Sequence, residues 1–279
     1  MKRFIALLMA AIMVLSMAAC GAKTEAPAAT EAPATEAAPM TAAEKAAAEA
    51  EIRYALALLL DRNYIVEEIT QAGQLPASSF VPMGLTDADG SQFYENAGPN
   101  ADFNGYYNVA KEAFEANYAE AYEILCKYYE VDENGMFTNF PTLTYLYNTN
   151  EAHKAIGEYI QSALAAVGIN IQLENQEWNT FLNTRKNGDF SVARNGWVAD
   201  YNDPICFLDM WTTVSGNNDV QFGKGEHKNT AIYSLDLTAY GINYKVENAT
   251  WADTYDYLIA QIKASTDNEL RYQLMHVAE

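Results

Sequence analysis

The chain has 279 residues, with 17 Lys and Arg against 37 Asp and Glu, which gives a formal net charge of -20. No cluster of basic residues interrupts this excess of acid, so nucleic acid and anionic lipid headgroups are excluded as expected ligands. The acidic balance itself indicates a solvated surface and assigns no specific partner.

The first 20 residues, MKRFIALLMAAIMVLSMAAC, predict a secretory signal, because two basic residues precede an apolar run and then small residues. The apolar run is shorter than the roughly 20 residues that a membrane-spanning helix needs. Cys20 stands where a lipoprotein signal places its diacylated cysteine, although Met17 occupies a position that usually carries leucine. We therefore expect a lipid anchor on the outer face of the cell membrane. The alternative is a secreted protein whose early cysteine has no role.

Residues 21–45 consist almost entirely of Ala, Glu, Thr and Pro, and this composition predicts a disordered tether. The proline-free part from Ala42 to Ala50 is expected to be helical and to continue into the folded domain, residues 46–279. Within that domain, Cys126 and Cys206 match no metal-binding spacing, and they are expected to be buried apolar residues rather than a disulfide.

Helices are predicted to open the domain. Apolar residues between Ile52 and Leu60 fall on one helical face, and Asp61 is the expected N-cap of a second helix over residues 62–70, which Gly73 stops. A long amphipathic helix is then expected from Ala110 to about Glu130.

The middle of the chain alternates strands and helices. A strand at 142–147, a helix from Asn150 to Gly168 and a strand at 169–173 predict a crossover that joins two parallel strands. A short helix ending at Gly188 and a third strand at 190–192 follow. The expected inward residues of that short helix are Trp178, Phe181 and Leu182.

Beyond Trp211 the sequence has few periodic signals, so an irregular excursion with one strand is expected, followed by helices over residues 253–264 and 267–279. Parallel strands alternating with helices place the chain in the α/β fold class.

The clearest functional signal lies in residues 175–204, NQEWNTFLNTRKNGDFSVARNGWVADYNDP. Trp197 and Asp200 follow the third strand, at the edge of the sheet where ligands of open α/β folds bind, and Arg185 and Arg194 precede them. This segment resembles the part of bacterial oligopeptide-binding proteins, the receptors of ABC importers in solute-binding family 5, that recognises the amino end of a peptide. The segments EIRYALALLLDRNYIVEEI and LPASSFVPMG resemble the same family.

The resemblance implies a single lobe of a type II periplasmic-binding-protein clamshell, with a mixed sheet flanked by helices. Members of the family are about twice as long and close two lobes on a peptide, so residues 46–279 correspond to a second lobe and the first lobe is expected to be absent or supplied by another chain. The implied function is extracytoplasmic capture of oligopeptides and their delivery to ABC permease subunits, with no cofactor and no enzymatic activity. An open lobe is expected to bind peptide weakly or not at all, because ion pairs exposed to solvent contribute only about 0 to 1 kcal/mol.

Asp200 is the expected partner of the peptide ammonium. Two unit charges at ~4 Å attract by about 4 kcal/mol in a partly dehydrated cleft and by about 1 kcal/mol in water. A simpler role for Asp200 is capping the turn before Pro204. Gly196 is expected to allow close backbone approach to the ligand, and Trp197 either forms a pocket wall or belongs to the core.

Arg185 and Arg194 are expected to bind the peptide carboxylate through charge-assisted hydrogen bonds. The alternative for both is a salt bridge to neighbouring Glu177 or Asp189. The resemblance also aligns His153 with a family histidine that meets the carboxyl end of longer peptides, and Asn148 belongs to the same stretch.

Other function classes have little support in the sequence. His153, His227 and His276 show no metal-ligand spacing, and no pair of acids is singled out for a hydrolase that uses two carboxylates. The main alternative is a cell-surface interaction protein that keeps the lobe fold without transporting peptides.

Overall fold

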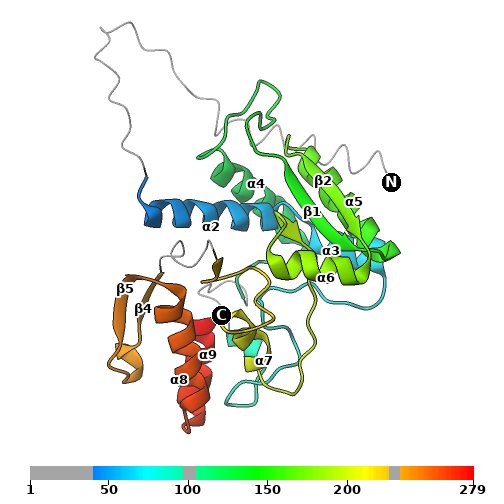
Figure 1. Cartoon of the computed structure of the whole chain (residues 1–279). Coiled ribbons are helices and arrows are strands. Elements are labelled where there is room, and N and C mark those ends of the chain that lie inside the picture. The colour runs from blue at the N-terminus through cyan, green and yellow to red at the C-terminus, as the bar shows by residue number, and fades with distance from the viewer. Residues whose placement is uncertain (1–39, 97–104, 226–232) are drawn as a thin grey trace, which may run out of the picture.

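A computed structural model of the chain describes residues 40–96, 105–225 and 233–279. The predicted signal peptide, Cys20 and the tether as far as residue 39 lie outside these ranges. Among the described residues, no helix combines the length and the apolar composition needed to cross a membrane. The described chain forms two halves (Figure 1). The first, called the sheet half, comprises residues 42–70 and 105–193, and the second, called the helical half, comprises the described residues of 79–96 and 199–279.

Helix α2 (Ala42–Leu58) begins inside the predicted tether. Thr41 and Glu44 form a capping box: the Thr41 hydroxyl accepts a hydrogen bond from Glu44 N at 3.2 Å, and Glu44 Oε2 accepts one from Thr41 N at 2.7 Å. The last residues of the predicted tether are therefore helical and continuous with the domain, as their proline-free composition indicated.

The predicted N-cap at Asp61 is confirmed. Its carboxylate accepts hydrogen bonds from the first amides of α3 (Arg62–Tyr64), which continues as the π-helix η1 (Ile65–Thr70). The helix ends at Gln71, whose φ of 49° is left-handed, and not at Gly73 as predicted.

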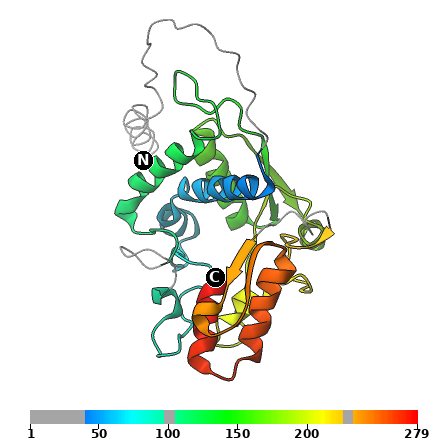
Figure 2. The ribbon, with the colours of Figure 1, turned by 90° about the vertical axis from the view of Figure 1, so that its left-hand side faces the viewer.

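The amphipathic helix is shorter than predicted. A 3-10 turn, η3 (Lys111–Ala113), leads into α4 (Phe114–Leu125), which packs against α2 (Figure 2). After Leu125 the chain closes with hydrogen bonds between residues three apart, Lys127 N to Ile124 O and Tyr128 N to Leu125 O, so the last turn tightens instead of continuing to Glu130.

The predicted strand, helix and strand are confirmed. Strands β1 (Leu143–Asn148) and β2 (Ile171–Gln176) pair in parallel, and α5 (Glu151–Ala165) crosses between them from its N-cap Asn150. Gly168 follows α5 with a φ of +85°, and a Cβ there would lie 2.6 Å from the Phe137 carbonyl oxygen, so this turn requires glycine.

Strand β3 (Val192–Ala193) pairs with the other side of β1, which gives a parallel sheet of order β2-β1-β3. Helix α6 (Trp178–Asn187) leads to β3 and ends at Gly188, with φ +77°, as predicted. Phe181 is fully buried, but Trp178 is 46% exposed, so its predicted inward orientation is wrong. Trp178 is the first residue of the helix, and its ring stacks over Phe181 from the outside.

The predicted α/β class, with a sheet flanked by helices, is confirmed. Two further strands, β4 (Tyr233–Asp236) and β5 (Lys245–Ala249), pair with each other in an antiparallel sheet that is separate from the parallel one. The sequence predicted one strand in this region without placing it, and β5, KVENA, gives a weak signal because most of its residues are polar and exposed.

The helical half contains α7 (Ile205–Leu208), α8 (Tyr257–Ala264) and α9 (Asn268–Ala278), and the last two confirm the predicted C-terminal helices. The short elements of this half are η2 (Phe93–Asn96), η4 (Asp209–Trp211), η6 (Thr238–Tyr240) and η7 (Ala252–Asp256). Its apolar residues form a cluster separate from that of the sheet half. Cys206 is a buried, free cysteine in α7, as predicted. Cys126 is disulfide-bonded, though not to Cys206, so the prediction that it is a buried apolar residue outside any disulfide is wrong.

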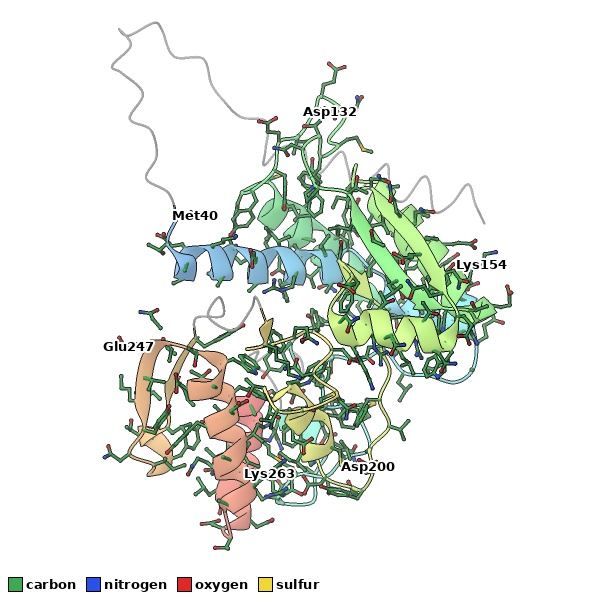
Figure 3. The ribbon with its side chains drawn as sticks, viewed as in Figure 1. Met40, Asp132, Lys154, Asp200, Glu247 and Lys263 are labelled. Atoms are coloured by element: carbon green, nitrogen blue, oxygen red, sulfur yellow. The ribbon has the colours of Figure 1, made fainter. Side chains whose placement is uncertain are left out.

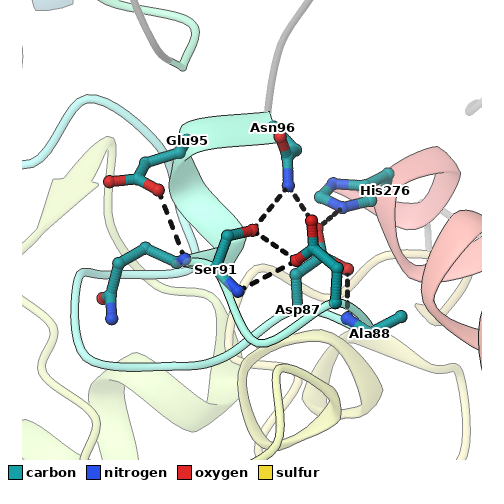
Figure 4. A network of polar contacts seen from close by, with 8 residues as sticks. Asp87, Ala88, Ser91, Glu95, Asn96 and His276 are labelled. Atoms are coloured by element: carbon teal, nitrogen blue, oxygen red, sulfur yellow. Dashed lines mark hydrogen bonds and ion pairs between the residues drawn. The ribbon is translucent and has the colours of Figure 1, made fainter.

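A polar network fastens the loop before η2 to α9 (Figure 4). Asp87 Oδ2 accepts from Asn96 Nδ2 at 2.7 Å and lies 2.8 Å from His276 Nε2, and Oδ1 accepts from Ala88 N. The His276 ring stacks on Phe93, with 3.9 Å between centroids. Burial by itself would raise the pKa of Asp87, but the bonds from Asn96, His276 and Ala88 outweigh it and hold that pKa below its usual value.

Candidate functional site

The predicted ligand residues fall into two groups. One group lies at the carboxyl end of the parallel sheet and comprises Asn148, His153, Arg185 and Arg194. The other lies on the segment 195–204, called the linking segment, which runs from β3 to α7 and carries Gly196, Trp197 and Asp200 (Figures 1 and 3).

Asn148 and His153 contact each other directly. Asn148 ends β1 and is buried, and its Oδ1 lies 3.0 Å from Nδ1 of His153 in the first turn of α5. Because a carbonyl oxygen only accepts, Nδ1 donates and Nε2 remains available to a ligand. Burial lowers the pKa of His153, and the nearby positive charge of Arg194 lowers it further, so the imidazole is neutral near pH 7.

Arg194 follows β3 directly, and its backbone amide donates to Leu146 O at 2.8 Å, which continues the pairing with β1. Its side chain is half-buried, and no carboxylate among the described residues forms an ion pair with it. Burial lowers the pKa of the guanidinium, Tyr145 opposes this, and the positive charge of Arg185 adds to it. Arg194 is therefore a partly desolvated cation with no carboxylate partner in the described part of the chain.

Gly196 makes room for that cation. A Cβ at this position would lie 3.1 Å from Arg194 Nη2, so a side chain would push the guanidinium away. We predicted that Gly196 allows a ligand backbone to come close. In this structure the space beside Gly196 is next to the guanidinium of Arg194.

Arg185 is paired, but not with the predicted acids. Its Nε lies 2.7 Å from Asp219 Oδ2, and the two side chains are 11% and 7% exposed. The predicted alternative, a salt bridge to Glu177 or Asp189, is wrong, because Glu177 caps α6 and Asp219 comes from a loop much further along the chain. Arg185 Nη1 also donates to the Arg194 carbonyl at 3.4 Å.

Asp200 is exposed, and within the described chain its carboxylate takes part in no hydrogen bond or ion pair. The turn-capping role that was the alternative for Asp200 belongs to Asp203, whose Oδ1 accepts from Ile205 N at 2.9 Å and whose Oδ2 pairs with Arg271 at 2.7 Å. Trp197 is not a core residue, since 38% of its surface is exposed. The linking segment also exposes Val198 and Tyr201.

The linking segment lies exposed at the surface, whereas Asn148 and Arg185 are largely buried. A cavity of about 520 Å³ lies between residues 73–83 and residues 107–110, and one of about 670 Å³ lies between Tyr54 of α2, residues 77–80 and residues 105–107; none of the predicted ligand residues lines either cavity. In the ranges that the structure describes, no group of three or more His, Cys, Asp or Glu could hold a metal ion. The arrangement can bind an anion at Arg194, with His153 as a second donor when its imidazole is protonated, and a cation at Asp200. Asp219 was missed by sequence reasoning, because nothing near it in the sequence signals its pairing with α6.

Comparison with known proteins identifies the family. The family model described as "Bacterial extracellular solute-binding proteins, family 5 Middle" matches residues 22–219. The dipeptide-binding protein DppE of Bacillus subtilis is 32% identical over 230 residues, covering 82% of this chain and 34% of DppE. The periplasmic oligopeptide-binding protein OppA of Salmonella typhimurium is 36% identical over 176 residues, covering 62% of this chain and 29% of OppA.

Solved structures agree with the sequence comparison. The crystal structure of Haemophilus influenzae OppA in complex with RPPGFSPFR is 28% identical, with a TM-score of 0.55, over 82% of this chain and 36% of that one. This chain thus spans about a third of the length of the curated relatives that it matches. It belongs to family 5 of the bacterial extracellular solute-binding proteins.

Proposed function

We propose that this chain is the ligand-recognising lobe of an extracytoplasmic receptor that captures oligopeptides for an ABC importer. The family supports this, as do the relatives named for dipeptide and oligopeptide binding and the related structure with a bound peptide. The observation that carries the proposal is the presence of both charges that an extended peptide requires. Among the described residues, Asp200 is an exposed acid without a partner, and Arg194 is a cation without a carboxylate partner.

In this proposal Asp200 binds the terminal ammonium and Trp197 forms the wall beside it. Arg194 binds the terminal carboxylate, and the Nε2 atom of His153 donates to it once that atom takes up a proton, with Asn148 holding the imidazole in orientation. Because these groups recognise the ends and not the side chains of a peptide, such a site accepts many sequences.

The exposure of Asp200 determines how strongly the lobe is expected to bind a peptide. An exposed ion pair at Asp200 contributes about 0 to 1 kcal/mol, and the same pair in a closed, partly dehydrated cleft would contribute about 4 kcal/mol. We therefore propose that the described lobe binds peptide weakly by itself and that a second lobe, supplied by another polypeptide segment or chain, completes the cleft.

We further propose that Cys20 is lipidated, that residues 21–45 tether the lobe to the outer face of the membrane, and that permease subunits receive the peptide. Metabolic labelling with a radioactive fatty acid tests the first point. Incorporation that a Cys20→Ala variant abolishes is expected.

The test of peptide recognition is calorimetric titration of the chain without its signal, using tri- to pentapeptides with free or acetylated amino ends. Asp200→Asn and acetylation should each weaken binding by up to about fivefold, and acetylation should have no further effect in the variant. The matched control is Asp189→Asn, which removes another exposed acid and should leave affinity unchanged.

Equal binding of free and acetylated peptides would contradict the role of Asp200. No binding by a demonstrably folded chain would favour the alternative, a surface protein that keeps the lobe fold without transport.

A further inference from the structure

Arg185 and Asp219 form a buried ion pair beside the predicted ligand residues. Both side chains are about nine-tenths buried, and the Nε to Oδ2 distance is 2.7 Å. The contact is a charge pair more than an aligned hydrogen bond, since Arg185 Nε and Asp219 Oδ1 have no hydrogen-bond partner among the described residues. Removing either charge would leave the other one buried and uncompensated.

The loop that carries Asp219, residues 212–225, is fixed in place. Asn218 is 1% exposed, and its side chain donates to the Phe222 carbonyl and accepts from the Phe222 amide at 2.9 and 3.0 Å. Gln221 Nε2 donates to Lys186 O, which docks the loop on the end of α6. The loop therefore holds Asp219 next to Arg185. The contact is set by the loop backbone and not only by the attraction between the two side chains.

The two arginines differ in whether their charge is neutralised. Arg185 donates to the backbone carbonyl of Arg194, and its positive charge contributes to the lowered pKa of Arg194. Asp219 neutralises Arg185, whereas Arg194 has no carboxylate partner within the described ranges.

We infer that Asp219 is a specificity-determining residue that withholds Arg185 from bound anions, so that this end of the site offers a ligand the guanidinium of Arg194 and not that of Arg185. The inference rests on the proposed function for the identity of the ligand. For a peptide, it means that the site accepts a carboxyl-terminal residue with a neutral side chain and discriminates against a second carboxylate, which would face Asp219.

The first test uses sulfate and does not depend on peptide binding. The Nε–Hε NMR signals of Arg185 and Arg194, assigned with the Lys variants of each, are followed while sulfate is added to the chain. In the wild type the Arg194 signal should shift and the Arg185 signal should stay. In Asp219→Asn both should shift. A wild-type Arg185 signal that follows sulfate would overturn the inference, and this arm decides it even where the Asn variant does not fold.

The second test compares Ala-Ala-Ala with Ala-Ala-Glu. Asp219→Asn should raise the affinity for Ala-Ala-Glu by about tenfold relative to Ala-Ala-Ala, the effect of one additional charge-assisted bond. The control, Asp209→Asn, makes the same change of net charge at a more exposed pair with Lys263 and should not alter the ratio.

The outcomes separate the two proposals. An unchanged peptide ratio in a folded Asp219→Asn variant that binds both peptides overturns the specificity role. If neither peptide binds to the wild type, the proposed function fails, and the sulfate titration still decides whether Asp219 withholds Arg185.

Discussion

Replacing Arg194 with Met should make the folded chain more stable and its ligand binding weaker. The guanidinium is half-buried without a carboxylate partner in the described ranges, and burial lowers its pKa, so the charged form is disfavoured by folding. The effective penalty for a fully buried ion is several kcal/mol. Because Arg194 keeps part of its surface in water, we expect a gain of about 1 kcal/mol, while Met preserves the apolar stem.

A gain of about 1 kcal/mol corresponds to a rise in Tm of roughly 2 to 4 °C for a domain of this size. On the ligand side, the loss of a charge-assisted hydrogen bond of about 1.5 to 3 kcal/mol should weaken binding of a free carboxylate roughly 10- to 150-fold. Differential scanning calorimetry measures the first effect, and titration with peptides that have free or amidated carboxyl ends measures the second.

The matched control is Lys154→Met, which removes a positive charge one residue after His153 from an exposed pair with Glu158. It should change stability by less than about 0.5 kcal/mol and leave binding intact. A fall in Tm for Arg194→Met, with the control unchanged, would refute the reasoning, because it would show that the guanidinium stabilises the fold.

Two further predictions concern pH. The His153 imidazole is neutral in the free site because its pKa is lowered, so a bound carboxylate should draw a proton onto it. Peptide affinity should then rise as pH falls from 8 to 6, by at most about tenfold per pH unit, and His153→Gln should flatten that dependence in titrations at several pH values. The folded-state pKa of Asp87 is lowered, so the stability that it contributes is present above its unfolded pKa and is lost as pH falls through the folded pKa. Asp87→Asn should therefore cost about 1.5 to 3 kcal/mol near neutral pH and show a smaller fall in Tm between pH 5 and 3 than the wild type; equal losses in both chains would contradict this.

Much of the local structure follows from the sequence, because the interactions that decide it join neighbours in the chain. Asp61 and Asn150 accept hydrogen bonds from amides two and three residues ahead, and Gly188 ends α6 with a left-handed backbone. Alternation of apolar residues likewise predicts β1 and β2, and their right-handed crossover makes them parallel. The order of these elements places the segment between α6 and α7 at the carboxyl edge of the sheet, and its resemblance to oligopeptide-binding proteins is what makes it a candidate site.

Tertiary structure alone decides which of the site residues are free to act. Asp219, on a loop 34 positions further along the chain, pairs with Arg185. Arg194 has no carboxylate partner among the described residues, and Asp203, not Asp200, caps the turn before α7. The division of the chain into two apolar clusters and the pairing of β4 with β5 were equally absent from the local pattern. These features depend on distances between residues far apart in the chain, and charge pairing depends on such distances and on burial, neither of which residue spacing encodes.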